Sequence, residues 1–304
     1  MTNLSAPIFH NEDKARAHLE AIRWPDGPFC PHCGEVDNVT RLEGASHRPG
    51  LFQCNSCREH FSVTVGTVME RSHIPLHKWV LAFHLMASSK KGISAHQLHR
   101  MLGVTYKSAW FMAHRIRVAM GTAAGEGPVG GSDKIVQADE TEIALSKKSR
   151  KRPRSANPKI LTLVERGGRT RSFHLDSNKD VKGKIREHMD PASTLHTDSA
   201  TYYKGLVEKH EAVDHSKDEW ARDGVSTNAA ENFFSVFKRG MVGTYQHCDD
   251  RHLHRYLAEF DFRQTHRVAT GVNDTMRAEL AIKGAEGKRL TYRQPVEAGN
   301  GEIQ

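Results

Sequence analysis

The sequence lacks any run approaching the ~18 consecutive apolar residues that a membrane-spanning helix requires. Its opening stretch, MTNLSAPIFHNEDKARAHLE, also lacks the basic start and the apolar core of a secretory signal peptide. Both absences argue against the membrane and secreted classes, so the sequence predicts a cytoplasmic protein.

Cysteine is scarce, with five in 304 residues, and four of the five form two C-x-x-C pairs. In a reducing cytoplasm this pattern favours a metal site over a disulfide framework. Negative charge is in the minority, because 36 Asp and Glu stand against 44 Lys and Arg. A basic protein suits a partner made of phosphates, but many basic proteins bind no nucleic acid, so charge alone does not decide the function.

The paired cysteines have the spacing of a zinc site. They follow the pattern C-x2-C-x20-C-x2-C and are Cys30, Cys33, Cys54 and Cys57. Four thiolates at this spacing bind one zinc ion tetrahedrally, with each pair supplied by a tight turn. Four unrelated buried cysteines are the alternative, and the paired spacing argues against it. The sequence predicts a structural zinc ribbon, which says little about function because such ribbons contact both DNA and proteins.

Residues 93–120 have the pattern of a helix-turn-helix, with a turn at Gly103 and a helix cap at Thr105. The second helix carries the basic and polar residues Lys107, His114, Arg115 and Arg117. In a helix-turn-helix this second helix lies in the major groove, so Lys107, Arg115 and Arg117 are predicted to bind DNA. A plain helical hairpin with a solvated basic face is the alternative.

Hydrophobic periodicity predicts the remaining elements and the domain limits. We expect helices at 11–23, 75–92, 178–189, 227–239 and 250–266, and strands at 134–143, 160–166, 169–175 and 194–200. The Gly-rich stretch 121–133 is the best linker. The expected units are an N-terminal helix and zinc ribbon at 1–70, the helix pair at 71–120, the linker, an α/β domain at 134–270 and a loose tail at 271–304. A basic run at 147–154 is either a solvated loop or a phosphate contact.

Three acids follow elements that can bring them together. Asp139 and Asp198 each end a strand, and Glu231 lies in the first turn of a later helix. Because side chains alternate along a strand, Glu140 points away from Asp139 and cannot serve the same site. Acids gathered at one sheet edge repel one another unless cations neutralise them, and Mg²⁺ or Mn²⁺ are the ions that carboxylate oxygens prefer. Pattern alone is weak evidence, since most of the 36 acids are expected at the surface.

Three segments, HTDSATYYKGL, NAAENFFSVFKRGMVGTYQH and HLHRYLAEFDFRQTHR, strongly resemble bacterial insertion-sequence transposases of the DDE type. More narrowly, the chain resembles the group that carries an N-terminal zinc ribbon, and the resemblance runs from the cysteine pairs to about residue 267. It implies that 134–270 is an RNase H-like catalytic domain, an α/β fold with a mixed sheet flanked by helices. It also implies binding of terminal inverted repeats, metal-dependent DNA cleavage and strand transfer.

The resemblance assigns catalytic and metal-binding roles to residues at matching positions. Asp139 in ADET matches the family's first aspartate, and Asp198 in HTDS matches the second. Members of this group vary between glutamate and asparagine at the third position, where this sequence offers Glu231 and Asn228. Glu231 fits better, because the family places a basic residue seven positions after the glutamate and Lys238 stands there. Asn228 is then expected to cap the helix.

The same resemblance implies partners and cofactors. Lys238 and the adjacent Arg239 are expected to contact the DNA backbone, and two Mg²⁺ or Mn²⁺ ions are expected to bind at Asp139, Asp198 and Glu231. We expect a homodimer or larger assembly on double-stranded DNA, at the nucleoid. The glycine-rich stretch usual after the first aspartate is replaced by SKKSRKRPRSANPK. A non-catalytic zinc-ribbon regulator and an RNase H-like nuclease without strand transfer are the alternatives.

Overall fold

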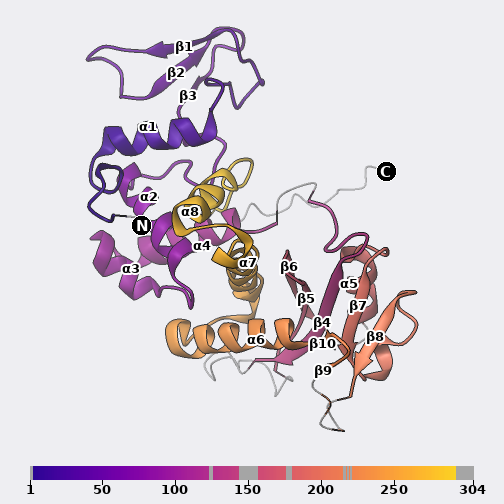
Figure 1. Ribbon diagram of the computed structural model, residues 1–304. Coiled ribbons are helices and arrows are strands. Elements are labelled where there is room, and N and C mark those ends of the chain that lie inside the picture. Colours follow the sequence, from indigo (N-terminus) through magenta and orange to yellow (C-terminus); the bar gives the residue numbers. More distant parts are fainter. Residues whose placement is uncertain are drawn as a thin grey trace, which may run out of the picture.

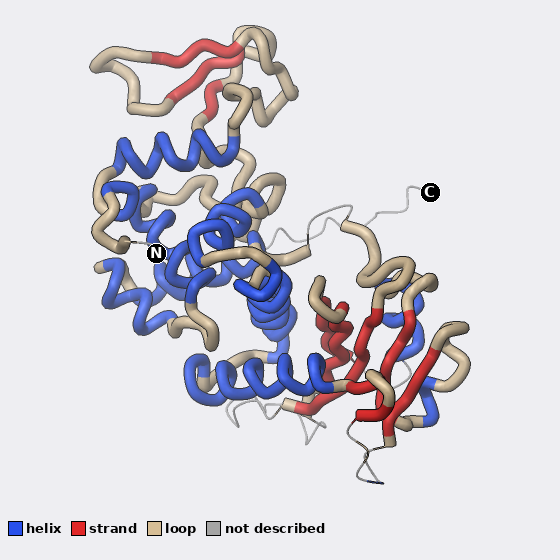
Figure 2. Tube along the Cα trace, in the orientation of Figure 1, coloured by secondary structure: helices blue, strands red, loops and turns tan. Residues whose placement is uncertain are grey.

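The computed structural model describes residues 3–122, 126–143, 157–175, 180–214, 217, 219 and 221–291. Figures 1 and 2 show a helical part with a small antiparallel sheet at one end and a larger mixed sheet at the other. The basic run 147–154 lies outside the described residues. None of the helices within the described ranges has the length and apolarity that crossing a membrane requires.

The N-terminal part is built from helices around one core, with the zinc ribbon attached. Its elements are the 3-10 turn η1 (Pro7–Phe9), α1 (Glu12–Arg23), β1 (Val39–Leu42), β2 (Leu51–Cys54), β3 (His60–Phe61), α2 (Leu76–Ser88), α3 (Ala95–Leu102) and α4 (Tyr106–Ala119). β1, β2 and β3 form an antiparallel sheet in that order. Asn11 caps α1 by accepting a hydrogen bond from the Lys14 N–H at 2.9 Å, as its position before the helix predicts.

The predicted helix pair is present with its predicted turn. Gly103 has a φ of 58°, which lies in the left-handed region that favours glycine, and its N–H closes α3 on the His99 carbonyl. The Thr105 side chain caps α4 by accepting from the Ser108 N–H at 3.1 Å. Local capping therefore determines both the end of α3 and the start of α4.

The second part of the chain contains a five-stranded mixed sheet in the order β6-β5-β4-β7-β8. The elements from residue 135 onward are β4 (Ile135–Glu142), β5 (Lys159–Glu165), β6 (Thr170–Leu175), α5 (Asp180–His188), β7 (Thr194–Asp198), the 3-10 turn η3 (Thr201–Tyr203), β8 (His210–Val213), β9 (Ala221–Arg222), β10 (Val225–Ser226), α6 (Asn228–Gly240), the π-helical turn η5 (Met241–Tyr245), the 3-10 turn η6 (Asp250–His252), α7 (Leu253–Thr265), the 3-10 turn η7 (Val268–Thr270) and α8 (Asp274–Lys283). β4 is antiparallel to β5 and parallel to β7, which is parallel to β8.

The two faces of this sheet have separate cores. Val136 and Ala138 of β4 pack with Val181 and Ile185 of α5 on one face. Ile160 of β5 packs with the aromatic residues of α6 and α7 on the other. The alternation along β4 consequently directs Gln137 and Asp139 toward the α6 face. The predicted fold class is confirmed: an RNase H-like mixed sheet flanked by helices, preceded by a zinc ribbon and a helical region.

The expected domain limits differ from the structure in three places. Within the expected tail, α8 packs against α2, and its Ala278, Ala281 and Ile282 are buried in the N-terminal core. That core also joins α1 to α2 and α4, so no boundary lies near residue 70. Within the expected linker, Val129 is fully buried and pairs with Met189 in an isolated bridge, in which its N–H donates to the His188 carbonyl and its carbonyl accepts from the Asp190 N–H. Strands β8, β9 and β10 were not predicted, because they are short and lack clear alternation.

Candidate zinc, metal and DNA-binding sites

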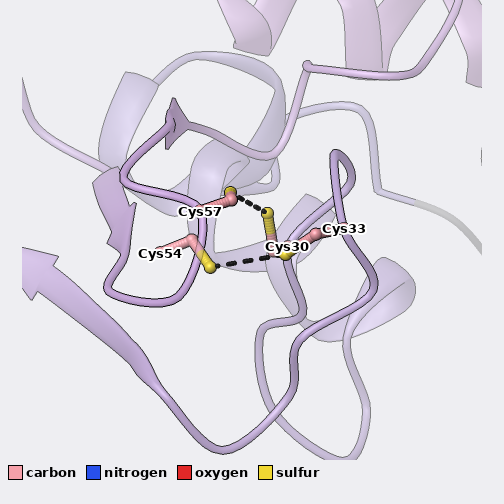
Figure 3. Close-up of side chains that lie close together, drawn as sticks. All are labelled: Cys30, Cys33, Cys54 and Cys57. Carbon is pink, nitrogen blue, oxygen red and sulfur yellow. Dashed lines mark hydrogen bonds between the residues drawn. The ribbon is translucent and has the colours of Figure 1, made fainter.

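The four cysteines of the ribbon converge on one point. Figure 3 shows their side chains facing one another, and all four sulfur atoms lie within 4.8 Å of each other. The Sγ atoms of Cys30 and Cys57 are 3.6 Å apart, as are those of Cys33 and Cys54. A tetrahedral site with Zn–S bonds of ~2.3 Å requires sulfur–sulfur separations of ~3.8 Å. The donor set and its dimensions therefore fit a structural zinc ion.

The two cysteine turns have the same hydrogen-bond pattern, which holds the thiols in place. In the first, the Gly34 N–H donates to the Cys30 carbonyl at 2.9 Å, and in the second the Arg58 N–H donates to the Cys54 carbonyl at 2.8 Å. Gly34 and Arg58 have φ values of 81° and 66°, so each turn ends in the left-handed region. The glycine meets this demand without strain, whereas the arginine meets it at a cost.

The two aspartates lie at the same edge of the larger sheet. β4 and β7 are adjacent and parallel, with Gln137 opposite His196, so Asp139 and Asp198 emerge side by side two residues later. The Glu140 N–H donates to Asp139 Oδ1 at 2.8 Å, and the Ala200 N–H donates to Asp198 Oδ1 at 3.0 Å. Backbone groups thus orient both carboxylates at the carboxyl ends of the strands.

The surroundings of Asp139 raise the pKa of its carboxyl group. Burial raises its pKa to about 7, and the negative charges of Glu140, Asp198 and Glu231 add to the rise. The contribution of the Glu231 charge to this pKa indicates that Glu231 lies near the two aspartates. The three carboxylates do not form as tight a cluster as the four thiols. Half-buried acids whose negative charges act on one another are the environment that a divalent cation stabilises.

Glu231 lies in the first turn of α6, as predicted, but the helix is capped differently. Thr227 is the N-cap residue, and its hydroxyl donates to Glu231 Oε1 at 2.8 Å. Asn228 is the first helical residue and is exposed, so the expectation that Asn228 caps the helix is wrong. The helix start favours the negative charge of Glu231. Lys238 and Arg239 lie exposed in the last turn of the same helix.

Glu140 lies on the opposite face of β4 and has a partner that the sequence did not indicate. The Tyr203 hydroxyl donates to Glu140 Oε2, and burial raises the pKa of this carboxyl. Tyr203 is itself fully buried beside α5. The strand alternation therefore points the Glu140 side chain away from Asp139, as predicted, although the Glu140 charge still contributes to the raised pKa of Asp139. The two adjacent tyrosines in DSATYYKGL are the sequence feature that could have indicated a partner for Glu140.

The predicted DNA-binding residues of α4 have different environments. Lys107 is exposed in the first turn. Arg117 is buried and pairs with Glu259 of α7, and His114 is fully buried, so neither lies on an exposed face. Arg115 is half-buried and donates to the carbonyls of Glu70 and Leu290. Helical periodicity in one sequence cannot tell which basic residues face a second helix, and the expectation for Arg117 is wrong.

Comparison with known proteins agrees with this architecture. Residues 125–265 match the ISXO2-like transposase domain, and residues 10–60 match the transposase zinc-ribbon domain. The chain belongs to the DDE transposases of insertion sequences that carry an N-terminal zinc ribbon. An uncharacterized protein in transposable element ISH50 of Halobacterium salinarum is 28% identical over 278 residues, which are 84% of this chain and 92% of that relative.

Proposed function

We propose that this protein binds the terminal inverted repeats of its insertion sequence, cleaves DNA at the ends of the element and joins them to target DNA. The observation that carries the proposal is the position of Asp139 and Asp198 on adjacent parallel strands, electrostatically coupled to Glu231 at the start of α6. Phosphoryl transfer needs positioning and charge stabilisation rather than a covalent enzyme intermediate, and a rigid group of three acids suits it.

Asp139, Asp198 and Glu231 would hold Mg²⁺ or Mn²⁺ through their carboxylate oxygens. When bound, two such ions supply activation of the attacking oxygen and stabilisation of the leaving oxygen. The residues themselves contribute orientation: backbone N–H groups hold the two aspartates, and the Thr227 hydroxyl holds Glu231. The raised pKa of Asp139 reflects burial and nearby negative charge, which a bound cation would offset.

Exposed basic residues are proposed to bind the DNA backbone. Lys238 and Arg239 lie on the helix that carries Glu231, and Lys107 lies at the start of α4, where the recognition helix of a helix-turn-helix contacts DNA. We propose that the zinc ribbon and the α3–α4 pair recognise the terminal repeats. Joining two ends to one target requires two active sites, so the proposed working form is a homodimer or larger assembly on DNA.

The test uses a supercoiled plasmid that carries the ends of this element. The full chain with Mg²⁺ is expected to nick the plasmid and to join a 3′-hydroxyl end to a second plasmid, and Asp198→Asn is expected to abolish both activities. Asp190→Asn is the matched control, because Asp190 precedes the same strand at its opposite end. Nicking without joining would identify a nuclease, and DNA binding without nicking would identify a regulator.

A further inference from the structure

The start of α6 has no side-chain cap of its own. Thr227 is the N-cap residue, but its hydroxyl donates to Glu231 rather than accepting from a backbone N–H. The first N–H groups of a helix need acceptors, and an N-cap side chain usually supplies one for the second or third helical residue. The acceptor at α6 therefore comes from elsewhere in the fold.

Gln137 of β4 supplies that acceptor. Its Oε1 accepts a hydrogen bond from the Ala229 N–H at 2.7 Å, and Ala229 is the second residue of α6. Its Nε2 donates to the Ser226 hydroxyl at 3.3 Å, just before the helix. Gln137 is 2% exposed, so water does not compete for these bonds. Gln137, a residue of strand β4, thus caps the first turn of α6 and also bonds to Ser226, which precedes that turn.

His196 makes a parallel contact from the next strand. It lies opposite Gln137 in the β4–β7 register and is also 2% exposed. Its Nδ1 accepts from the Ser226 N–H at 3.5 Å, so its Nε2 carries the proton and faces Glu211 Oε2 at 3.4 Å. Gln137 and His196 each stand two residues before an aspartate of the site and on the same face.

From this geometry we infer that Gln137 and His196 are positioning residues that set Glu231 against Asp139 and Asp198. The inference rests on the proposed function, because it concerns the acid site of that reaction. The start of the helix that bears Glu231 is capped by Gln137 and not by its own N-cap side chain. Gln137 and His196 lie two residues, or ~7 Å along the strands, before the two aspartates, so the three acids are held by the same two strands.

The test measures Mn²⁺ binding to the zinc-loaded full chain by calorimetry. Gln137→Met keeps a similar volume but removes both hydrogen bonds, and it is expected to weaken Mn²⁺ binding about 10- to 100-fold. Gln137→Glu keeps the Oε1 acceptor and is expected to restore most of the affinity. Gln53→Met, the same substitution in strand β2 of the ribbon, is the control and is expected to leave Mn²⁺ binding unchanged.

A double-variant cycle shows whether Gln137 acts through Glu231. In a Glu231→Ala background, Gln137→Met is expected to change Mn²⁺ affinity less than about twofold, since the residue it positions is gone. The inference would be overturned if Gln137→Met still weakened Mn²⁺ binding by about 10- to 100-fold in the Glu231→Ala background, or if Gln137→Met alone bound Mn²⁺ with wild-type affinity. If Gln137→Met does not fold, Ser226→Ala replaces it in the same cycle, with an expected weakening of about threefold.

The inference and the proposed function fail in different ways. If Asp198→Asn and Glu231→Ala both leave Mn²⁺ binding unchanged, the proposed acid site is wrong, and the inference falls with it. If those two variants weaken binding while Gln137→Met does not, the acid site stands and only the positioning role is overturned.

Discussion

Arg117 of α4 and Glu259 of α7 form a buried ion pair with 2.7 Å between Arg117 Nε and Glu259 Oε2. Glu259 is fully buried and also accepts from the Tyr245 hydroxyl, which follows α6, and from Arg263. Burial alone would raise the pKa of Glu259, but the Arg263 and Arg117 guanidiniums outweigh it and hold the pKa below its usual value. One carboxylate therefore joins α4 to α7 and to the turn that follows α6.

Neutralising Glu259 is expected to destabilise the protein strongly. Glu259→Gln would leave two arginines buried without a counter-charge, at a cost of about 3–5 kcal/mol. Glu187→Gln is the control, because Glu187 pairs with Lys184 at the surface, where solvent screens the pair and it contributes little to stability. Urea unfolding of both variants gives the comparison. A loss below about 1 kcal/mol for Glu259→Gln would contradict the role of this pair.

Glu231 and Asn228 are expected to differ sharply in cleavage assays. Glu231→Gln removes a proposed metal ligand worth several kcal/mol of charge stabilisation, so nicking is expected to fall about 100-fold or more. Asn228→Ala changes an exposed first helical residue and is expected to retain nicking within about threefold. The reverse pattern would show that the asparagine is the third catalytic residue.

The raised pKa of Asp139 predicts how stability depends on pH in the absence of Mg²⁺. Its folded pKa is about 7 and lies above the ordinary value of 3.8, so the folded state binds the extra proton between these values. Stability is therefore expected to fall as pH rises from 4 to 7, by up to about 4 kcal/mol from this group.

The contribution of Asp139 is isolated by comparing two proteins. Thermal unfolding of wild type and Asp139→Asn between pH 5 and 8 should show a difference that grows in favour of the variant as pH rises. Adding Mg²⁺ is expected to shrink this difference, because a bound cation stabilises the charged carboxylate. A pH-independent difference would mean that Asp139 is ionised throughout this range.

Zinc removal is expected to unfold the ribbon. The sheet of the ribbon consists of three short strands between residues 39 and 61, so metal binding is expected to supply much of its folding free energy. Cys54→Ser is expected to reduce the zinc content below one ion per chain and to expose the ribbon to proteolysis. Cys248→Ser is the matched control, since Cys248 is buried in the α6–α7 core and should leave zinc content unchanged.

Lys107 is expected to contribute to DNA affinity. Lys107→Ala should weaken binding about three- to tenfold and reduce the salt dependence by about one phosphate contact. Lys182→Ala is the control: it changes an exposed lysine of α5 and should alter neither the DNA affinity nor its salt dependence. Arg117→Ala is expected to lower stability instead, because Arg117 is buried against Glu259. If the salt dependence of DNA binding were unchanged in Lys107→Ala, Lys107 would not contact the DNA.

Interactions between residues that are close in the chain determined several structural features of this protein. The cysteine spacing predicted the ribbon, Asn11 and Thr105 predicted two helix starts, and strand alternation predicted that Asp139 and Glu140 face opposite sides. Each of these predictions depends only on residues that are close together in the chain, so a single sequence is enough to make it. The family resemblance added the order of the acids and the RNase H-like fold.

Only the tertiary structure decided which face of each element is covered. Arg117 has the same local sequence signals as an exposed recognition-helix arginine, yet its partner lies 142 residues away. The helix at 274–283 was expected to be part of a loose tail, because its core partner α2 is far away in the sequence; the hydrogen bond from Arg277 to the Ala87 carbonyl joins residues 190 apart. The Gln137 cap on α6 likewise joins residues 92 apart. Such contacts depend on the packing of whole helices and strands, which local propensity does not contain.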